Sequence, residues 1–308
     1  MWFKHLQLYR LLDEHDWSFD QLLETLETQR FTPVGESQAR RTGWTSPAGR
    51  QSDQLLHEVR GHRLMTLKRQ ERLLPATVVR ETLEERVEQL THEQGQPPSR
   101  RDRQALKEQI VEELLPRAFT RVTRTDLWWD CERRLIGINA ASAKRAEEVL
   151  DLLRETLGSL KVVPLAPQTP AGRTMTGWLT DATSRPEGLT LGDQLELRAK
   201  GDDGVLRARL IDPDGEEVRV ALEVGRQASR LALVIEEQMS LVLQEDMSIR
   251  SIRFADAVTQ EIDELEYDDD PVLLMETEFA LMAHVLGQST DRLMAWLGGE
   301  AQTAPATP

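Results

Sequence analysis

Three acidic residues lie close together near the middle of the chain, beside an arginine. Asp126, Asp130 and Glu132 precede Arg133. Carboxylates spaced along a strand with a nearby cation suit a Mg²⁺-dependent nuclease, because Mg²⁺ prefers hard oxygen ligands. However, Asp130 and Glu132 also stand where a hairpin turn favours polar residues, and no lysine accompanies them. We therefore favour the turn and keep a metal-dependent nuclease as an alternative hypothesis.

Basic side chains suggest a second chemistry, the binding of phosphate groups, which needs local positive charge. The candidates for contact with DNA phosphates are Arg100, Arg101, Arg117, Arg121, Lys144, Arg145, Arg207 and Arg209. Lys144 and Arg145 fall in the first turn of an expected helix, where the helix dipole disfavours cations. Their position therefore suggests a role toward a partner rather than toward stability.

The spacing of the arginines predicts which of them share a face of a strand. Side chains at even spacing lie on one face, and those at odd spacing on opposite faces. Arg117 and Arg121 are therefore expected to share a face, as are the two arginines within residues 205–210. Arg250 and Arg253 are three apart and are expected on opposite faces.

Charge is unevenly distributed along the chain, whose net charge is -15. Residues 97–145 carry 11 Lys and Arg against 7 Asp and Glu, whereas residues 255–308 carry 1 against 12. Judged by charge alone, two oppositely charged faces that attract each other are favoured over nucleic-acid binding. A regulator that binds other proteins through its acidic carboxyl end is a third hypothesis.

Composition narrows the class of protein. A hydrophobic content of 39% with 30% charged residues is typical of a soluble globular protein. We expect a cytoplasmic protein, because no apolar run of about eighteen residues and no signal peptide is present. The single Cys131 excludes an internal disulfide framework and a cysteine zinc site. Glycine-rich phosphate loops are absent, so neither an ATP motor nor a dinucleotide enzyme is expected, and no cofactor or metal is assigned.

The apolar periodicity predicts an α+β fold of antiparallel sheets with packed helices. We divide the chain into a central α+β domain of residues 1–74 with 116–170 and a protruding helical hairpin at 75–115. A second α+β region with an antiparallel meander follows at 171–300, and a disordered tail at 301–308.

Three local expectations bear on the site. Residues 36–53, which are polar and contain Gly and Pro, are expected to form a long loop. Residues 272–275 are expected to form a strand, followed by a helix capped by Thr277. Trp128 and Trp129 could stack on bases, but tryptophans in strands are more often anchors of a core or a subunit interface.

Several blocks of the sequence resemble one known family. They are MWFKHLQLYRL at the start, Thr42-Gly43-Trp44, LLPRAFTR at 114–121, the tryptophan pair, INAASAKRAEEVLDLLRETLGSL at 138–160, KVVPL at 161–165 and AWLGGEAQ at 295–302. Together they resemble the RdgC family of bacterial recombination-associated proteins. The resemblance extends from Met1 to about Gln302 and is more specific than any single motif.

The resemblance implies a function and an assembly. RdgC-like proteins bind double-stranded DNA with little sequence preference, without known catalytic chemistry, and restrain RecA-promoted strand exchange. The resemblance implies a ring-shaped homodimer that encircles DNA on the nucleoid. It also implies a small gate contact between subunits at Phe119 and Leu210. Leu210 stands where the family pattern favours a polar or basic residue, so a more apolar gate is expected here.

Overall fold

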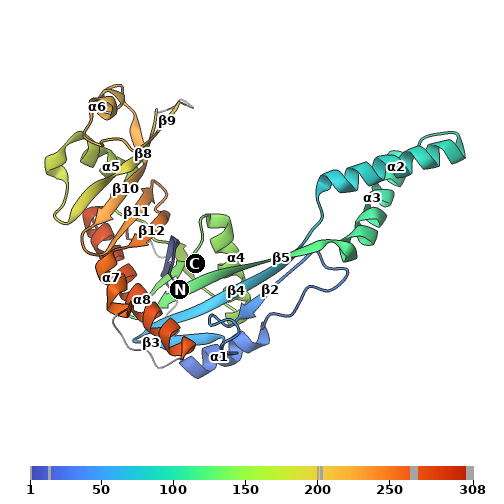
Figure 1. Cartoon of the computed structure of the whole chain (residues 1–308), viewed down its shortest axis with the longest axis horizontal. Coiled ribbons are helices and arrows are strands. Elements are labelled where there is room, and N and C mark those ends of the chain that lie inside the picture. The colour runs from blue at the N-terminus through green and yellow to red at the C-terminus, as the bar shows by residue number, and fades with distance from the viewer. Residues whose placement is uncertain (1, 13–14, 200, 202–203, 264–269, 303–308) are drawn as a thin grey trace.

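One antiparallel sheet organises this computed structural model, which describes residues 2–12, 15–199, 201, 204–263 and 270–302 (Figure 1). The strands are β1 (His5–Leu11), β2 (Arg40–Thr45), β3 (Leu56–Val59), β4 (His62–Leu73), β5 (Phe119–Asp130), β6 (Leu135–Ile138), β7 (Val162–Pro164), β8 (Leu189–Arg198), β9 (Val205–Arg209), β10 (Gln227–Ile235), β11 (Met239–Gln244) and β12 (Ile249–Phe254). Their order is β2-β4-β5-β6-β1-β12-β11-β10-β8-β9, with β3 paired to β4 and β7 to β1.

Helices flank this sheet or extend from it. The α-helices are α1 (Phe19–Thr28), α2 (Ala76–Gln94), α3 (Arg100–Leu114), α4 (Ala143–Leu157), α5 (Ala171–Thr180), α6 (Glu216–Glu223), α7 (Asp256–Asp263) and α8 (Pro271–Trp296), and the 3₁₀ turns are η1 (Leu115–Arg117) and η2 (Ala182–Ser184). None of the helices within the described ranges is long and apolar enough to cross a membrane. The α+β class and the helical hairpin of α2 and α3 are confirmed.

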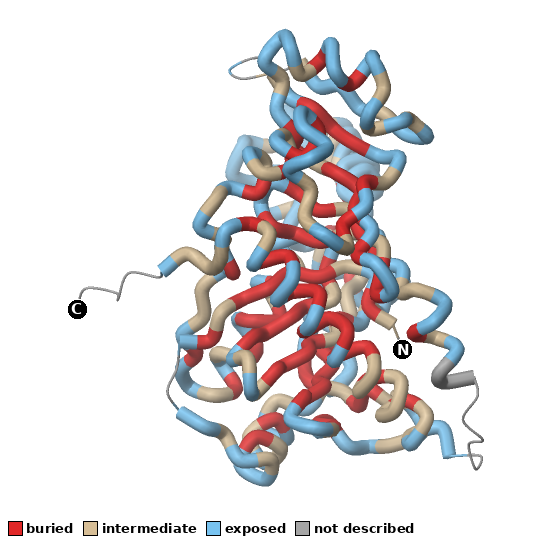
Figure 2. Tube along the Cα trace, turned by 90° about the vertical axis from the view of Figure 1, so that its left-hand side faces the viewer, coloured by how far each residue is buried: buried red, intermediate tan, exposed pale blue. Residues whose placement is uncertain are grey.

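Two hydrophobic cores lie on opposite faces of the sheet. Trp128 belongs to a core that includes Phe279 of α8 and Met175 of α5. Its neighbour Trp129 points the other way, into a core with Val149 of α4 and residues of α1. Both tryptophans are buried, so their prediction as structural anchors is confirmed. The buried residues follow the sheet through the centre of the molecule (Figure 2).

The second half of the sheet is covered on one face only. The buried hydrophobic residues of β8, β11 and β12 all belong to the core with α5 and α8, as do those of β10 except Ala232. Among the described residues, none of these strands contributes to the core beneath α1 and α4. One face of β8–β12 is therefore left open.

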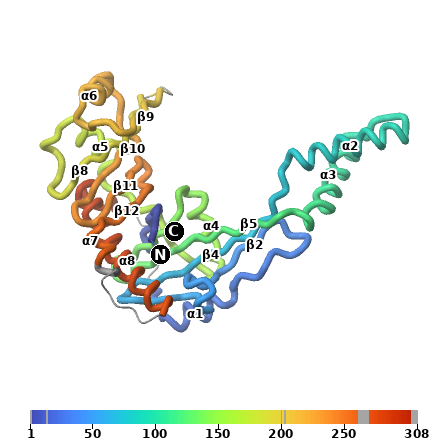
Figure 3. Tube along the Cα trace, viewed as in Figure 1, coloured from blue at the N-terminus to red at the C-terminus, as the bar shows by residue number. Residues whose placement is uncertain are grey.

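The sheet and its extensions form a crescent. The α2–α3 hairpin extends from one end, and β8, β9 and α6 form the other (Figure 1). Helices α7 and α8 lie on the outer side, whereas α4 lies on the inner side, as the chain trace also shows (Figure 3). Helix α5 packs on β10, within the core that also includes α8. Because α5 lies on the outer side of the crescent (Figure 1), the open face of these strands turns toward the inside.

Two local predictions are wrong because tertiary contacts outweigh local signals. Residues 36–53 contain β2, which pairs with β4 along its whole length. Residues 272–275 form the start of α8 and not a strand. Asp270 caps this helix by accepting hydrogen bonds from the backbone N–H groups of Val272 at 2.9 Å and Leu273 at 3.3 Å.

The predicted disordered tail begins with a residue that is held in place. The backbone N–H of Ala301 donates a hydrogen bond to the carbonyl oxygen of Ala166 at 2.9 Å. Glu300, just before it, pairs with Arg10 of β1 through its carboxylate. The rest of the tail, residues 303–308, lies outside the described residues.

Gly137 provides a test of the packing beneath α8. A Cβ at this position would lie 2.6 Å from Cε3 of Trp128 and 2.8 Å from Cδ1 of Leu6. Gly137→Ala is therefore expected to cost about 1–3 kcal/mol of unfolding free energy, measured by urea denaturation. Gly177→Ala in α5 is the control, because no atom would lie within 4 Å of its new Cβ. Equal stability of the two variants would contradict this packing.

Candidate functional site

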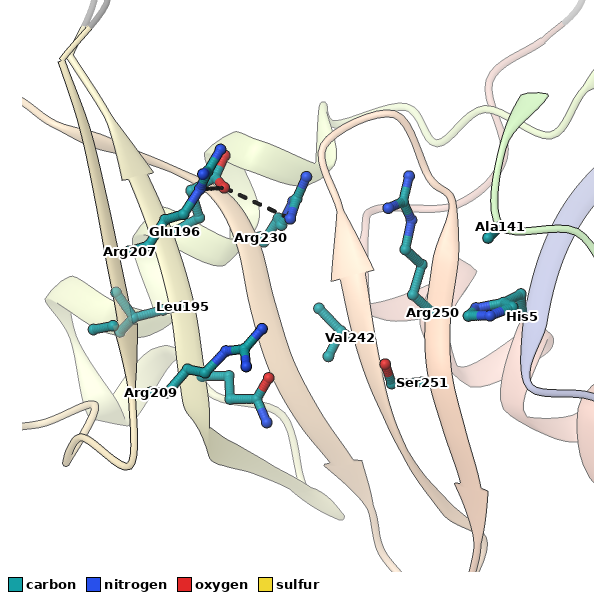
Figure 4. Close-up of a pocket in the computed structure, with 12 residues that line it drawn as sticks. His5, Ala141, Leu195, Glu196, Arg207, Arg209, Arg230, Val242, Arg250 and Ser251 are labelled. Carbon is teal, nitrogen blue, oxygen red and sulfur yellow. Dashed lines mark hydrogen bonds and ion pairs between the residues drawn. The ribbon is translucent and has the colours of Figure 1, made fainter. Parts of the chain in front are cut away.

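Arginines from three strands gather on the open face of the sheet. We call this the arginine face and define it by Arg207 and Arg209 of β9, Arg230 of β10, and Arg250 and Arg253 of β12. Figure 4 labels all of them except Arg253, which lines an adjoining cavity together with Val242 and Ser251. The strand register aligns them: Arg207 lies opposite Glu196, Glu196 opposite Arg230, and Val242 opposite Arg250. At the usual spacing of about 4.8 Å between strands, the face extends roughly 19 Å from β9 to β12.

A β-bulge places both arginines of β12 on this face, so the prediction that they lie on opposite faces is wrong. Arg250 pairs with Val242 and Arg253 with Ser240, with a register shift between the two pairs. Ser251 lies in the shift and has a φ of 52°, in the left-handed region. Because the bulge adds one residue, two side chains three apart point the same way.

A buried carboxylate organises one end of the arginine face. The side chain of Glu196 is 2% exposed and lies 2.8 Å from Nε of Arg207 and 2.9 Å from Nη2 of Arg198. Ser229 donates its hydroxyl to the same carboxylate at 2.9 Å, and Arg230 lies 3.7 Å away. Burial by itself raises the pKa of Glu196, but these hydrogen bonds and the charge of Arg230 outweigh it and lower the pKa to about 2.

Arg209, Arg250 and Arg253 form no ion pair with a described carboxylate at the salt-bridge distance. The only carboxylate among the described residues that line the cavity around Arg209 and Arg250 is Glu196, which three other arginines already bind. The face therefore carries an excess of positive charge, although the whole chain is acidic. Such a local excess attracts anions regardless of net charge.

A second network of charges connects α4 to the sheet. Arg145 donates hydrogen bonds to the hydroxyl groups of Thr125 at 2.9 Å and Thr123 at 2.5 Å, and to Glu148 at 2.8 Å. These contacts stabilise the docking of α4, contrary to the expectation that Arg145 serves only a partner. The neighbouring Lys144 is exposed at the helix start. The assignment of both residues to DNA contact stays a prediction.

Arg121 and Arg117 do not share a strand face, because Arg117 lies in η1, before the strand begins. Arg121 is 61% exposed at its side chain and pairs with Glu71, which also binds Arg69. The hydrogen bond from Arg121 is the largest of the effects that lower the pKa of the Glu71 carboxyl. Arg121 is therefore partly neutralised, unlike Arg250.

The hairpin carries its own basic residues. Arg100 and Arg101 are exposed at the start of α3, which a reciprocal pair of hydrogen bonds between Ser99 and Asp102 caps. Arg100 lines a shallow groove together with Arg103 and Lys107. This site lies on the hairpin, apart from the arginine face.

The three carboxylates of the nuclease hypothesis serve separate structural roles. Asp126 accepts hydrogen bonds from Thr66 at 2.9 Å and Asn139 at 3.4 Å, and burial raises its pKa. The Asp130 side chain is fully buried and caps the turn by accepting from the backbone N–H of Arg133 at 2.9 Å. Glu132 is exposed on the turn. In the described part of the chain, no three His, Cys, Asp or Glu residues cluster to hold a metal ion.

Two apolar side chains stand out in solvent on the two arms of the crescent. Phe119, at the start of β5, is 86% exposed, and Leu210, directly after β9, is 90% exposed. Leu210 also has a φ of 56°, which is unusual for a branched apolar residue. Aromatic side chains such as that of Phe119 are enriched in interfaces between proteins.

Together these features define a class: an α+β protein with a continuous curved sheet whose inner face is rich in arginine. A family model described as "Putative exonuclease, RdgC" matches residues 1–300. Proteins named "Recombination-associated protein RdgC" from Yersinia pestis (strain Pestoides F) and Yersinia enterocolitica are each 38% identical over 303 residues, covering 98% of this chain and 99% of the relative. The chain belongs to the RdgC family, whose relatives are named for recombination.

Five members of this site were not among the candidates from the sequence: Glu196, Arg230, Arg250, Arg253 and His5. Glu196, Arg230 and Arg250 become neighbours only through strand pairing between distant segments. His5, opposite Arg250 in β1, is separated from it by most of the chain. The alternation of polar and apolar residues in β10 could have placed Arg230 on the polar face. In β12, however, no local feature of the sequence marks the bulge at Ser251.

The pKa of Glu196 leads to a prediction about stability. Because its folded pKa is lowered, the stabilising contribution of Glu196 is present above the unfolded pKa of about 4.5 and is lost as the pH falls toward about 2. Glu196→Gln is expected to lower the free energy of unfolding by about 1–3 kcal/mol at neutral pH, and by less in acid. Denaturation at several pH values measures this.

The control is Glu223→Gln, which removes an exposed carboxylate from the end of α6. This control is expected to stay within about 0.5 kcal/mol of the wild type. If the free energies of unfolding of Glu196→Gln and the wild type differ by the same amount in acid as at neutral pH, the carboxylate is not the stabilising group.

Proposed function

We propose that this protein binds double-stranded DNA through its phosphates, encircles it as a homodimer and restrains RecA-dependent recombination. The observation that carries the proposal is the arginine face, an excess of guanidinium groups on the inner side of a crescent. Contacts to phosphates hold a duplex without reading its sequence. The family's recombination-related name supports the same role.

The distribution of charge supports this mode of binding. The acidic carboxyl end, residues 255–308, includes α7 and α8, which lie on the outer side of the crescent (Figure 1). A negative outer side repels DNA, while the arginine face attracts it. Charge thus directs the duplex to the inside.

Further phosphate contacts are assigned to the other basic candidates. Arg207 and Arg209 belong to the arginine face. Arg117, Arg121 and Lys144 would contact the duplex from the centre of the crescent, and Arg100 and Arg101 from the hairpin. Arg145, hydrogen-bonded to Thr123, Thr125 and Glu148, would act mainly by holding α4 in place.

The proposed ring uses two separate subunit contacts. A two-fold dimer of crescents closes only if both arms of each copy reach the partner. Phe119, exposed on one arm, is the proposed apolar anchor of the smaller contact, which opens to admit DNA, and Leu210, exposed on the other arm, is also assigned to the subunit interface. A closed ring on the duplex would hinder the strand exchange that RecA promotes.

No catalytic step is part of this proposal. The carboxylates at 126, 130 and 132 are engaged in hydrogen bonds or separated on the turn, so they do not converge on one metal ion. The purified protein is expected to leave an end-labelled duplex intact in the presence of Mg²⁺. Cleavage that disappears with Asp130→Asn would favour the nuclease hypothesis.

Salt dependence tests the arginine face. The double variant Arg209→Gln, Arg253→Gln is expected to bind any duplex more weakly and to reduce the slope of log affinity against log salt by about 0.9 for each phosphate that it no longer neutralises. Fluorescence anisotropy over a salt series measures both. The control is Arg292→Gln in α8, outside the face, which should leave the slope unchanged. An unchanged slope in the double variant would refute the assignment.

Phe119→Ala tests the gate. Because Phe119 is already exposed, its truncation is expected to change unfolding free energy by no more than about 0.5 kcal/mol, against about 3–5 kcal/mol for a core aromatic. The variant should stay dimeric through the larger contact but be released faster from closed circular DNA. Sedimentation and release kinetics measure this.

The matched control for the gate is Leu273→Ala, an exposed apolar residue in α8. It should leave retention on circular and linear DNA unchanged. If Phe119→Ala is also retained on circular DNA like the wild type, Phe119 is not part of a gate.

A further inference from the structure

A cavity opens in the arginine face where the two halves of the sheet meet. Its volume is about 330 Å³, and its lining includes Arg209, Arg230 and Arg250 together with His5 of β1 (Figure 4). Cavities at the lower end of the range of about 300–1,000 Å³ are large enough for small ligands. The cavity is thus a local pocket within a broader basic surface.

Charge in this cavity is not balanced by the protein. Four arginines line it, at positions 207, 209, 230 and 250, against one carboxylate, that of Glu196. Glu196 lies beside Arg207 and Arg230, on the far side of the cavity from Arg250. Glu196 therefore does not neutralise Arg209 and Arg250, and their guanidinium groups can bind an anion from outside the protein.

Two buried nitrogen atoms at the edge of the cavity point independently to a missing ligand. Nδ1 of His5 and Nε of Arg250 are both shielded from solvent without a hydrogen-bond partner among the described residues. Buried polar atoms in proteins are nearly always paired. The two residues lie opposite each other in the β1–β12 pairing, so one bound group can reach both.

The surroundings of His5 oppose its protonation. Burial is the largest effect that lowers its pKa, and the positive charges of Arg250 on β12 and of the adjacent Lys4 lower the pKa further. On the other sides, Asn139 accepts hydrogen bonds from the backbone N–H of His5, and Ala141 lines the cavity; neither carries charge. His5 is therefore neutral near pH 7 while the cavity holds no anion.

We propose that this cavity holds one phosphate group of the bound duplex and that His5 takes up a proton from solvent as the phosphate enters. The inference rests on the phosphate binding put forward above as the function. A phosphate oxygen supplies the acceptor that His5 and Arg250 lack, and its negative charge stabilises the imidazolium ion. Only a proton moves, from water to the imidazole ring.

The sign of the resulting pH dependence follows from linkage. Phosphate raises the pKa of His5 in the bound state above its lowered value in the unbound protein. Affinity is therefore highest below the pKa of the unbound state and falls as the pH rises through the pKa of the bound state. Each unit of difference between the two gives up to about a tenfold change in affinity.

Duplex affinity at constant ionic strength, compared at about pH 5.5 and about pH 8, on either side of the usual histidine pKa of about 6.5, tests the proposal. The wild type should bind more tightly in acid. His5→Gln should show the weaker affinity at both pH values, and His5→Lys the stronger affinity at both. His15→Gln, an exposed histidine outside the cavity, is the control and should behave like the wild type.

NMR titration of the His5 ring in the wild-type protein supplies a readout that needs no variant to fold. Its pKa should rise in the presence of a saturating duplex. A rise with inorganic phosphate as well would show that any phosphate group can enter, and a rise with the duplex alone that the site is specific to the backbone. Both results support the proposal.

Two results separate the inference from the proposed function. If the duplex binds but His5→Gln keeps the full pH dependence and the ring pKa stays unchanged, the cavity proposal is wrong and DNA binding stands. If the duplex does not bind at any pH, the proposed function is wrong. If, in addition, the pKa of the His5 ring does not change in inorganic phosphate, the cavity proposal is wrong too.

Discussion

The pairing of β1 with β12 is the constraint on which the architecture depends. Two aligned residue pairs, His5 with Arg250 and Leu6 with Ile249, join the halves of the sheet. A hydrogen bond from the backbone N–H of Ile252 to the carbonyl oxygen of Lys4, 3.0 Å long, extends this junction. Because the junction is continuous, the amino-terminal strand and the late meander form one curved surface.

This junction also sets the chemistry of the inner face. On one side of it α4 covers the sheet, and Glu148 of α4 and Glu71 of β4 neutralise arginines there. On the other side no described helix packs on the same face, so arginines project there with one buried carboxylate among them. Glu196 holds some of these arginines in fixed positions, and the bulge at Ser251 brings two more to the same face. Positive charge is thus concentrated where the crescent is concave, in a chain that is acidic as a whole.

The parts of the fold that depend on local patterns were predictable from the sequence. In the structure Ser18 and Ser99 cap the starts of helices, and Gly95 and Gly158 end helices in the left-handed conformation, as the general preferences of serine and glycine predict. Strand β2 was missed because its polar residues gain order only by pairing with β4. The proposed division into two α+β regions stays a prediction.

The site was only half predictable. Arg207 and Arg209 share a face, as their spacing requires, but the residues that complete the site come from β1, β10 and β12. Alternation of side chains along a strand would place Arg250 and Arg253 on opposite faces. The extra residue of the bulge shifts the alternation by one, so both lie on the same face. The resemblance to RdgC gave the family, which the full-length matches confirm, but it did not indicate the bulge or the cavity.

The central claim is that duplex DNA lies on the inner face of the crescent, and protection of arginines from chemical modification tests it most directly. Phenylglyoxal labels accessible guanidinium groups, and mass spectrometry locates the labelled residues. A bound duplex is expected to protect Arg209, Arg250 and Arg253 while Arg292, in α8 outside the arginine face, stays reactive. Protection of Arg292 with continued labelling of the other three would contradict the account.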